Sequence, residues 1–156
     1  MIELQNICFE YGSEEQNIAG RGALHNINLH IPDGQIVLLC GESGCGKTTI
    51  TRLLNGLIPH FYEGNLTGTI CIDGKEINDQ HYMKLHYCSG TVFQNPRSQF
   101  FNVDTTSELA FGLENRGMEE TQILKKVDKT VQELKLEKLM NRSIFDLSGG
   151  EKQKIA

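Results

Sequence analysis

One stretch constrains this chain more than any other: Gly41-Glu42-Ser43-Gly44-Cys45-Gly46-Lys47-Thr48. It follows an apolar run over residues 36–40 and leads into residues 49–55, whose pattern predicts a helix. Two glycines separated by four residues and followed by Lys-Thr form the phosphate-binding loop pattern in the strand–loop–helix context that it requires. A glycine-rich turn before a core helix is the alternative, and the agreement of loop, strand and helix disfavours it.

Each residue type in this loop has a separate physical role. Gly41, Gly44 and Gly46 let the backbone turn tightly and come within hydrogen-bonding range of phosphate oxygens. Successive N–H groups at the positive end of a helix dipole then form an anion-binding site. We expect Lys47 to place its charge on β- and γ-phosphates and the Thr48 hydroxyl to ligate Mg²⁺.

Composition and charge exclude several classes of protein. The 156 residues suit one domain, and a net charge of −5 argues against a broad nucleic-acid-binding surface. No apolar run approaches the roughly 20 residues that span a bilayer, and residues 1–5 do not begin a signal peptide. The five cysteines lack metal-binding spacing and indicate reduced thiols in a cytosolic protein. The histidines form no ligand pattern, so we interpret them as structural or surface residues.

Hydrophobic periodicity predicts the secondary structure. Strands are expected at residues 2–9, 23–31, 35–40, 67–73 and 87–93, and helices at 48–57, 79–85, 105–115 and 119–135. The turn at residues 32–34 predicts a hairpin between the second and third strands, and Asp73-Gly74 predicts a turn. Thr105 and Glu108 offer a capping box. The last full helix places one apolar stripe on its core face: Ile123, Val127, Val131 and Leu134.

Two later stretches add to the loop. Gln94 follows the strand-like residues 91–93, and Ser148, Gly149 and Gly150 lie in Leu147–Gln153, which opens another helix. That helix start is a second place for an anion, with a serine hydroxyl to spare. Taken alone, the stretch is explained equally well by an ordinary helix cap. Together with the first loop, it predicts a composite site that a second copy of the chain completes.

These motifs resemble those of the ATP-binding-cassette (ABC) ATPases over essentially all 156 residues. Residues 41–48 match the Walker A loop, Gln94 the Q-loop glutamine, 147–153 the signature motif, and Tyr11 the aromatic that stacks on adenine. The resemblance implies an α/β fold: a P-loop NTPase (RecA-like) core with an N-terminal antiparallel β subdomain and a helical subdomain, incomplete at the C-terminus. The implied partial nucleotide-binding domain, 1–156, comprises the β subdomain with the Walker A core (1–93), the Q-loop with the helical subdomain (94–147) and the signature with its helix start (147–156).

The resemblance also implies a function for each motif. Two cassettes enclose two ATP molecules head to tail, with Ser148 and Gly150 touching the γ-phosphate in trans. Lys47 and Gln94 take the catalytic roles, and Thr48 and Gln94 ligate Mg²⁺. The implied partners are a second ABC ATPase subunit and a transmembrane subunit, with no nucleic acid, at the cytoplasmic face of the membrane. The implied nucleotide-binding residues are Tyr11, Gly41, Ser43, Gly44, Cys45, Gly46, Lys47, Thr48, Thr49, Ser148, Gly149 and Gly150.

A finer resemblance concerns the type of transporter. Residues 93–101 and 108–115 look like those of energy-coupling-factor importers for vitamins and for cobalt or nickel ions. The alternative is a cassette ATPase without a transport role, such as a DNA-repair or translation clamp. The acidic balance and the lack of coiled-coil heptads between Gln94 and Leu147 favour the importer. A small-molecule kinase would leave the signature stretch unexplained.

The chain departs from the family pattern at its end. Ala156 lies inside the signature helix, and no Walker B aspartate, adjacent catalytic glutamate or γ-phosphate-sensing histidine is present. Asp73 is better explained by a turn than as a substitute. We therefore expect a gene fragment that exposes an apolar edge at residues 35–40 and hydrolyses ATP negligibly by itself.

For several side chains, an ordinary structural role is an alternative to the functional role. Tyr11 is otherwise an ordinary strand-end aromatic, and Cys45 a small side chain that fits its loop. We expect alkylation of Cys45 to block nucleotide binding, and MgATP to protect it. Three aromatic side chains are interpreted either as docking aromatics or as core of the helical subdomain: Phe100, Phe101 and Phe111. Three lysines are interpreted as a solvated face: Lys125, Lys126 and Lys129.

Overall fold

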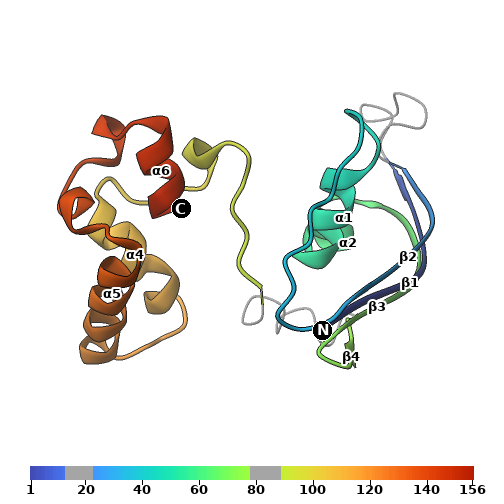
Figure 1. The fold of residues 1–156 in the computed structure, drawn as a ribbon, viewed down its shortest axis with the longest axis horizontal. Helices are drawn as coiled ribbons and strands as arrows, with labels where there is room; N and C mark the ends of the chain where they lie inside the picture. The colour runs from blue at the N-terminus through green and yellow to red at the C-terminus, as the bar shows by residue number, and fades with distance from the viewer. Residues whose placement is uncertain (13–22, 78–88) are drawn as a thin grey trace. The chain divides into compact units, whose positions relative to one another are not determined.

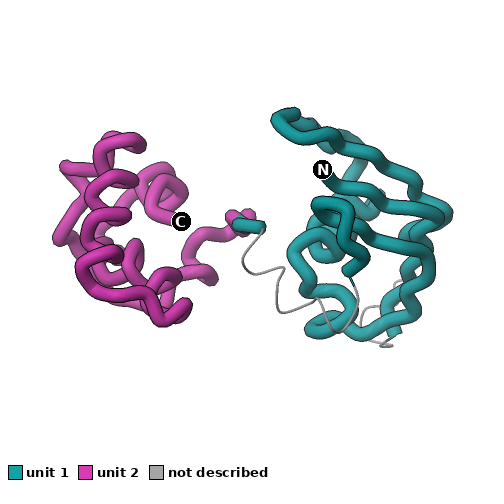
Figure 2. The backbone as a smooth tube through the Cα atoms, turned by 90° about the horizontal axis from the view of Figure 1, so that it is seen from below, with its two compact units in different colours: residues 1–91 teal, residues 92–156 magenta. Residues whose placement is uncertain are grey.

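The structure, a computed structural model, describes residues 1–12, 23–77 and 89–156 (Figure 1). The chain divides into two compact units, residues 1–91 and 92–156, which Figure 2 colours separately. The helix predicted at residues 79–85 and the first two residues of the strand predicted at 87–93 lie outside the described residues. No helix among the described residues is both long and apolar enough to cross a membrane.

A four-stranded antiparallel sheet forms the frame of the first unit, in the order β2-β1-β3-β4. Its central strand β1 pairs with β2 on one side and with β3 on the other. The first two strands lie where alternation predicted them, whereas β3 begins earlier than residue 67. The bounds are β1 Ile2–Tyr11, β2 Leu24–Ile31, β3 Gly64–Ile72 and β4 Lys75–Glu76.

An irregularity in β1 decides which side chains face the core. The β1–β3 register shifts between Gln5 and Cys8, and Asn6 takes a φ of 51°. Opposite it, Gly68 has a φ of 95°, and a Cβ there would lie 2.6 Å from the carbonyl oxygens of Gln5 and Asn6. The resulting bulge buries both Leu4 and Ile7, although their odd spacing would place them on opposite faces of a regular strand.

Two helices, α1 (Lys47–Leu54) and α2 (Leu57–His60), lie against one face of this sheet (Figure 1). The single helix predicted at residues 48–57 is divided because Gly56 takes a left-handed φ of 77°. Helices and sheet together bury one apolar cluster: Leu4, Ile7, Phe9, Leu24, Leu53, Ile58 and Ile70. This core fixes α1, and therefore the loop that precedes it, on the sheet.

The predicted strands at 35–40 and 87–93 are corrected. Residues 35–40 and the described residues 89–93 form no strand, and the predicted hairpin is wrong because β2 pairs with β1. A strand needs a neighbour for its backbone groups, and no described strand pairs with either segment. The predicted exposure of this apolar run is observed, with Ile36 101% and Leu38 84% exposed.

The second unit is helical. Its main helices are α4 (Thr105–Glu114), α5 (Glu120–Leu134) and α6 (Gly149–Ile155). Short 3₁₀ turns lie at η1 (Pro96–Ser98), η2 (Glu137–Leu139) and η3 (Ile144–Asp146). The predicted stripe of α5 is buried except at Leu134, which is 56% exposed where the helix ends. The core cluster comprises Ile123, Val127, Val131, Leu136, Leu139, Leu147 and Ile155.

The predicted capping box of α4 is wrong. Its N-cap is Asp104, whose carboxylate accepts hydrogen bonds from the backbone N–H groups of Thr106 (3.0 Å) and Ser107 (2.9 Å). Those bonds, first among them the ones from Ser107, hold the pKa of Asp104 below its ordinary value. Thr105 is buried and donates to the carbonyl of Leu139 at 2.7 Å. Glu108 instead accepts from the backbone N–H of Asn102 at 2.7 Å.

Candidate functional site

The Gly41–Thr48 loop leads directly into α1. Gly46, the N-cap of that helix, has a φ of 96°, and Gly44 has a φ of 85°. L-residues with a side chain rarely adopt these left-handed conformations, so the two glycines are required by the loop geometry. A Cβ on Gly41 would lie 2.6 Å from the Cys45 sulfur, so this position is also sterically restricted. The strand–loop–helix prediction is thus confirmed for the loop and the helix.

Lys47 folds back over the loop. Its Nζ donates to the carbonyl oxygens of Gly41 at 2.8 Å and Glu42 at 2.6 Å, and lies 3.6 Å from the Cys45 sulfur. An ammonium group has three N–H donors, and a thiol sulfur is a weak acceptor. Two donors hold the side chain in place, and the third is available to a stronger acceptor. The loop thus carries a fixed positive charge beside its exposed backbone.

The described residues supply no side-chain cap to the start of α1. The first turn contains no acidic residue either. Ser43 and Thr48 are both exposed beside this helix start. The first N–H groups of the helix and the positive end of its dipole are therefore left for a ligand. This arrangement suits a phosphate group, and the exposed Thr48 hydroxyl suits a hard cation bound to that phosphate.

Tyr11 ends β1 and is half-buried beside α1. Its hydroxyl lies 3.2 Å from Oγ1 of Thr49, and Arg52 donates to it at 3.0 Å. Its ring packs edge-on with those of Phe9 and Tyr62, at centroid distances of 4.8 and 6.4 Å. The structure therefore brings Tyr11 together with residues of the helix that the loop opens. Sequence reasoning missed Arg52, whose only signal was a spacing of three residues from Thr49.

The signature stretch opens α6 with a complete capping box. Oγ of Ser148 accepts from the backbone N–H of Glu151 at 3.3 Å, and the Glu151 carboxylate accepts from the backbone N–H of Ser148 at 2.8 Å. These bonds with Ser148, together with Arg142 at 3.5 Å, hold the pKa of Glu151 below its ordinary value. The Ser148 hydroxyl, which the sequence predicted to be spare, is therefore engaged in the cap of α6: its oxygen accepts from the Glu151 N–H, and its contact with the Glu151 carboxylate is the first cause of that group's lowered pKa. Gly149 and Gly150 are exposed.

Gln94 lies in the second unit, exposed, just before η1. The strand end on which it was predicted is absent, since residues 91–93 form no strand. Its neighbour Asn95 caps η1 by accepting from the backbone N–H of Arg97 at 3.1 Å. The exposed amide of Gln94 remains a candidate for a ligand.

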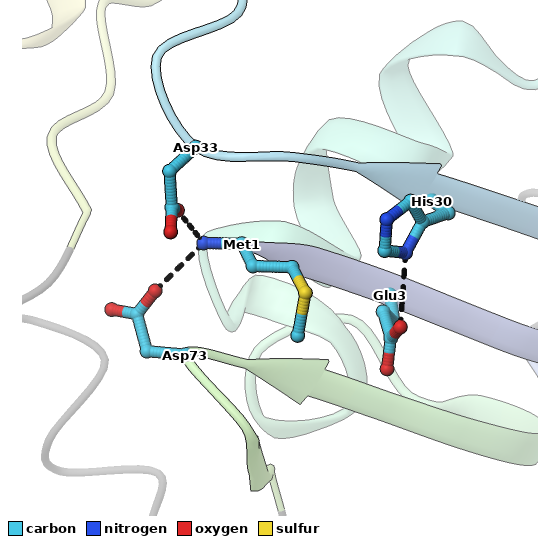
Figure 3. Close-up of polar contacts among 5 residues, drawn as sticks. All are labelled: Met1, Glu3, His30, Asp33 and Asp73. Atoms are coloured by element: carbon cyan, nitrogen blue, oxygen red, sulfur yellow. Dashed lines mark hydrogen bonds and ion pairs between the residues drawn. The ribbon is translucent and has the colours of Figure 1, made fainter.

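Asp73 has a structural role. It forms the predicted turn with Gly74 between β3 and β4, and it accepts from the amino group of Met1 at 2.8 Å (Figure 3). Asp33 also accepts from that amine, and hydrogen bonds to Asp33 and then Asp73 raise the pKa of the amine. The same amine lowers the pKa of Asp73. Among the described residues, no three His, Cys, Asp or Glu side chains gather as a metal-binding group.

Comparison with known proteins gives one consistent family. Residues 24–156 match the family model described as ABC transporter. Over its full length, the chain is 55% identical to an ABC transporter ATP-binding protein from Treponema denticola, of which it covers 31%. It is 36% identical, again over its full length, to the energy-coupling factor transporter ATP-binding protein EcfA1 of Ligilactobacillus salivarius, of which it covers 52%.

A solved structure has the same fold. The chain matches cbiO1 from Clostridium perfringens with a TM-score of 0.80 and 27% sequence identity, covering 99% of this chain and 58% of that one. That protein is described as part of the ABC transporter complex cbiONQ. The predicted α/β fold class is confirmed by this match. The chain thus spans between about a third and somewhat more than half of the length of these three proteins.

Proposed function

The chain belongs to the ABC transporter family, and from this premise we propose that it is the nucleotide-binding part of an ATPase subunit that powers a membrane importer. The observation that carries the proposal is the open start of α1. Lys47 is held over a loop whose glycines have left-handed conformations, and the described residues supply no anion there. A nucleotide triphosphate would supply that anion.

The predicted site residues would have different roles in binding MgATP. The Thr48 hydroxyl and the side-chain oxygen of Gln94 are hard donors of the kind that Mg²⁺ prefers. Lys47 would stabilise the charge on the terminal phosphate as it passes to water. Ser43, Cys45 and Thr49 complete the loop side of the site. The Tyr11 ring would stack on the adenine base.

The other half of the site would come from a second subunit, identical or related. Ser148 would donate its hydroxyl proton to the γ-phosphate in place of the Glu151 carboxylate, and the exposed backbone of Gly149 and Gly150 would allow close approach. We further propose that the 156 residues alone bind ATP but hydrolyse it negligibly, because the Walker B aspartate and adjacent catalytic glutamate of the family have no counterpart in this sequence.

The transport role is proposed from the relatives. Likeness to EcfA1, and to a protein described as part of the cbiONQ complex, supports an importer of the energy-coupling-factor type for vitamins or metal ions. Such a subunit would bind a transmembrane partner at the cytoplasmic face of the membrane. Activity stimulated by nucleic acid, and no complex with a membrane protein, would instead favour a DNA-repair or translation clamp.

Calorimetric titration with MgATP tests the proposal. We expect wild type to bind, and Lys47→Ala to bind about 10- to 100-fold more weakly, because charge-assisted hydrogen bonds to phosphate are lost. Lys47→Arg is the matched control, because it keeps the positive charge but replaces the compact ammonium group with a guanidinium. A folded wild-type chain that binds no MgATP, or binds it equally well as Lys47→Ala, contradicts the proposal.

A further inference from the structure

A small network joins Tyr11 to the side of α1. Nη1 of Arg52 donates to the Tyr11 hydroxyl at 3.0 Å, and that hydroxyl lies 3.2 Å from Oγ1 of Thr49. The guanidinium carbon of Arg52 also lies 3.8 Å from the centroid of the Tyr62 ring. Tyr11, Arg52 and Tyr62 are each half-buried, and Thr49 is 2% exposed. The Tyr11 hydroxyl is therefore held by two residues of one helix.

Arg52 is well suited to fix this hydroxyl. A guanidinium can only donate hydrogen bonds, so the phenolic oxygen must accept from Arg52, and its own proton remains available to Thr49. Contact with the face of Tyr62 limits the rotamers of Arg52, so less freedom is lost when the hydrogen bond forms. Tyr62 itself lies close to β3, whose first residue, Gly64, pairs with Tyr11.

The same helix carries the phosphate loop. Thr49 is the third residue of α1 and Arg52 lies one turn further on, while Lys47 begins the helix at the loop. Tyr11 belongs to β1, and its backbone alone leaves the ring free to rotate about two side-chain torsions. Tethering the hydroxyl to α1 fixes the distance between this ring and the phosphate loop.

We infer that Arg52 is a positioning residue for nucleotide binding: it holds Tyr11 at the distance from the phosphate loop that a base joined to a triphosphate requires. The inference rests on the proposed function, in which Tyr11 stacks on the base. It adds a specificity device, because Arg52 raises affinity for a nucleoside triphosphate but not for its phosphate chain alone.

The experiment compares two probes, MgATP and magnesium tripolyphosphate, by calorimetry on the full 156-residue chain. Arg52→Met removes the donor and keeps the length of the side chain. We expect it to weaken MgATP binding about five- to tenfold and to change tripolyphosphate binding less than about twofold. Tyr11→Phe, which keeps the ring and removes only the hydroxyl, should have a similar effect.

A double-mutant cycle separates positioning from general structural damage. If Arg52 acts through the Tyr11 hydroxyl, Arg52→Met costs almost nothing further in the Tyr11→Phe background. Equal MgATP affinity of wild type and both single variants overturns the inference, as does an equal loss for both probes or additive losses in the cycle. If Arg52→Met does not fold, the affinities of Tyr11→Phe for MgATP and for magnesium tripolyphosphate test the inference instead. Wild type that binds neither probe contradicts the proposed function itself.

Discussion

The two glycine-rich helix starts of this chain, at α1 and at α6, are alike in sequence and opposite in chemistry. At α6, Ser148 and Glu151 satisfy each other's backbone N–H groups, and Glu151 places a negative charge at the positive end of the dipole. At α1, no described side chain caps the helix, the first turn has no acid, and Lys47 adds a positive charge. One helix start contains its own anion, and the other is left for a ligand.

This difference assigns different tasks to the two motifs. An uncapped, positively charged helix start gains most from a bound phosphate, because no side chain in the part of the chain that the structure describes already caps it. A capped start gains less, because its serine hydroxyl is already engaged with Glu151 and its glycine backbone is what it offers. We infer that the α1 loop supplies most of the nucleotide affinity and that the α6 start adds to it only when a second subunit presents it.

The largest expected effect comes from giving α1 an anion like that of α6. Thr48→Asp places a carboxylate in the first turn, and we expect it to weaken ATP binding at least about tenfold relative to Thr48→Asn, through repulsion of the phosphates. The same change should raise the free energy of unfolding by about 0.3–1 kcal/mol. Calorimetry with and without magnesium measures the ATP affinities, and urea unfolding measures the free energy of unfolding. Equal affinities of the Asp and Asn variants would show that this helix start does not hold the phosphates.

The alkylation rate of Cys45 is a direct measure of whether a ligand occupies the loop at residues 41–48. It is exposed, and its sulfur lies 3.6 Å from Nζ of Lys47. We expect saturating MgATP to slow its alkylation about tenfold or more, because the bound phosphates cover the loop, and prior alkylation to block binding. Site-resolved mass spectrometry measures the rate, with the exposed Cys40 as an internal control. Identical labelling rates at Cys45 with and without MgATP would contradict the assignment.

A smaller effect is expected from removing the cap of α6. Ser148→Ala deletes the side-chain acceptor for the Glu151 N–H and should lower the free energy of unfolding by about 1 kcal/mol. MgATP affinity of the isolated chain should not change, since this start supplies little of it. Ser148→Asn, which can still cap, is the matched control in urea unfolding. Loss of MgATP affinity in Ser148→Ala with retained stability would reverse the roles given to the two helices.

The smallest effect concerns acid stability. The folded-state pKa of Glu151 lies below its ordinary value of 4.5, so its contribution is present above that pH and is lost as the pH falls through the lowered folded value. Wild type should therefore lose its advantage over Glu151→Gln as the pH drops below about 4.5. Urea unfolding of both proteins from pH 7 to pH 3 tests this. A stability difference that does not depend on pH would mean that the carboxylate charge does not stabilise α6.

Local sequence patterns were sufficient to predict those features of the fold that depend on neighbouring residues. The glycine spacing at residues 41–48 predicted the loop and the start of α1, and period-two alternation predicted β1 and β2. The stripe of α5 predicted three buried positions, while Leu134 is exposed because the helix ends there. Each of these features depends on residues within a few positions of one another.

Contacts between distant residues could not be predicted in this way. The bulge in β1 brings Asn6 close to Gly68, and the network on α1 joins Arg52 to Tyr11, 41 positions away. Residues 35–40 have the composition of a buried strand, but a strand forms only beside another strand. At α4, Asp104 and Thr105 are both good N-caps, and burial of Thr105 against Leu139 decides between them.

Amide hydrogen exchange with saturating MgATP tests the central claim, that the open start of α1 holds the phosphates, most directly. We predict that peptides covering residues 41–49 exchange more slowly when MgATP is bound, because their N–H groups donate to phosphate oxygens. Peptides from α5, residues 120–134, should exchange at the same rate with and without nucleotide. Unchanged exchange at residues 41–49, in a chain that calorimetry shows to be saturated with MgATP, would contradict the account.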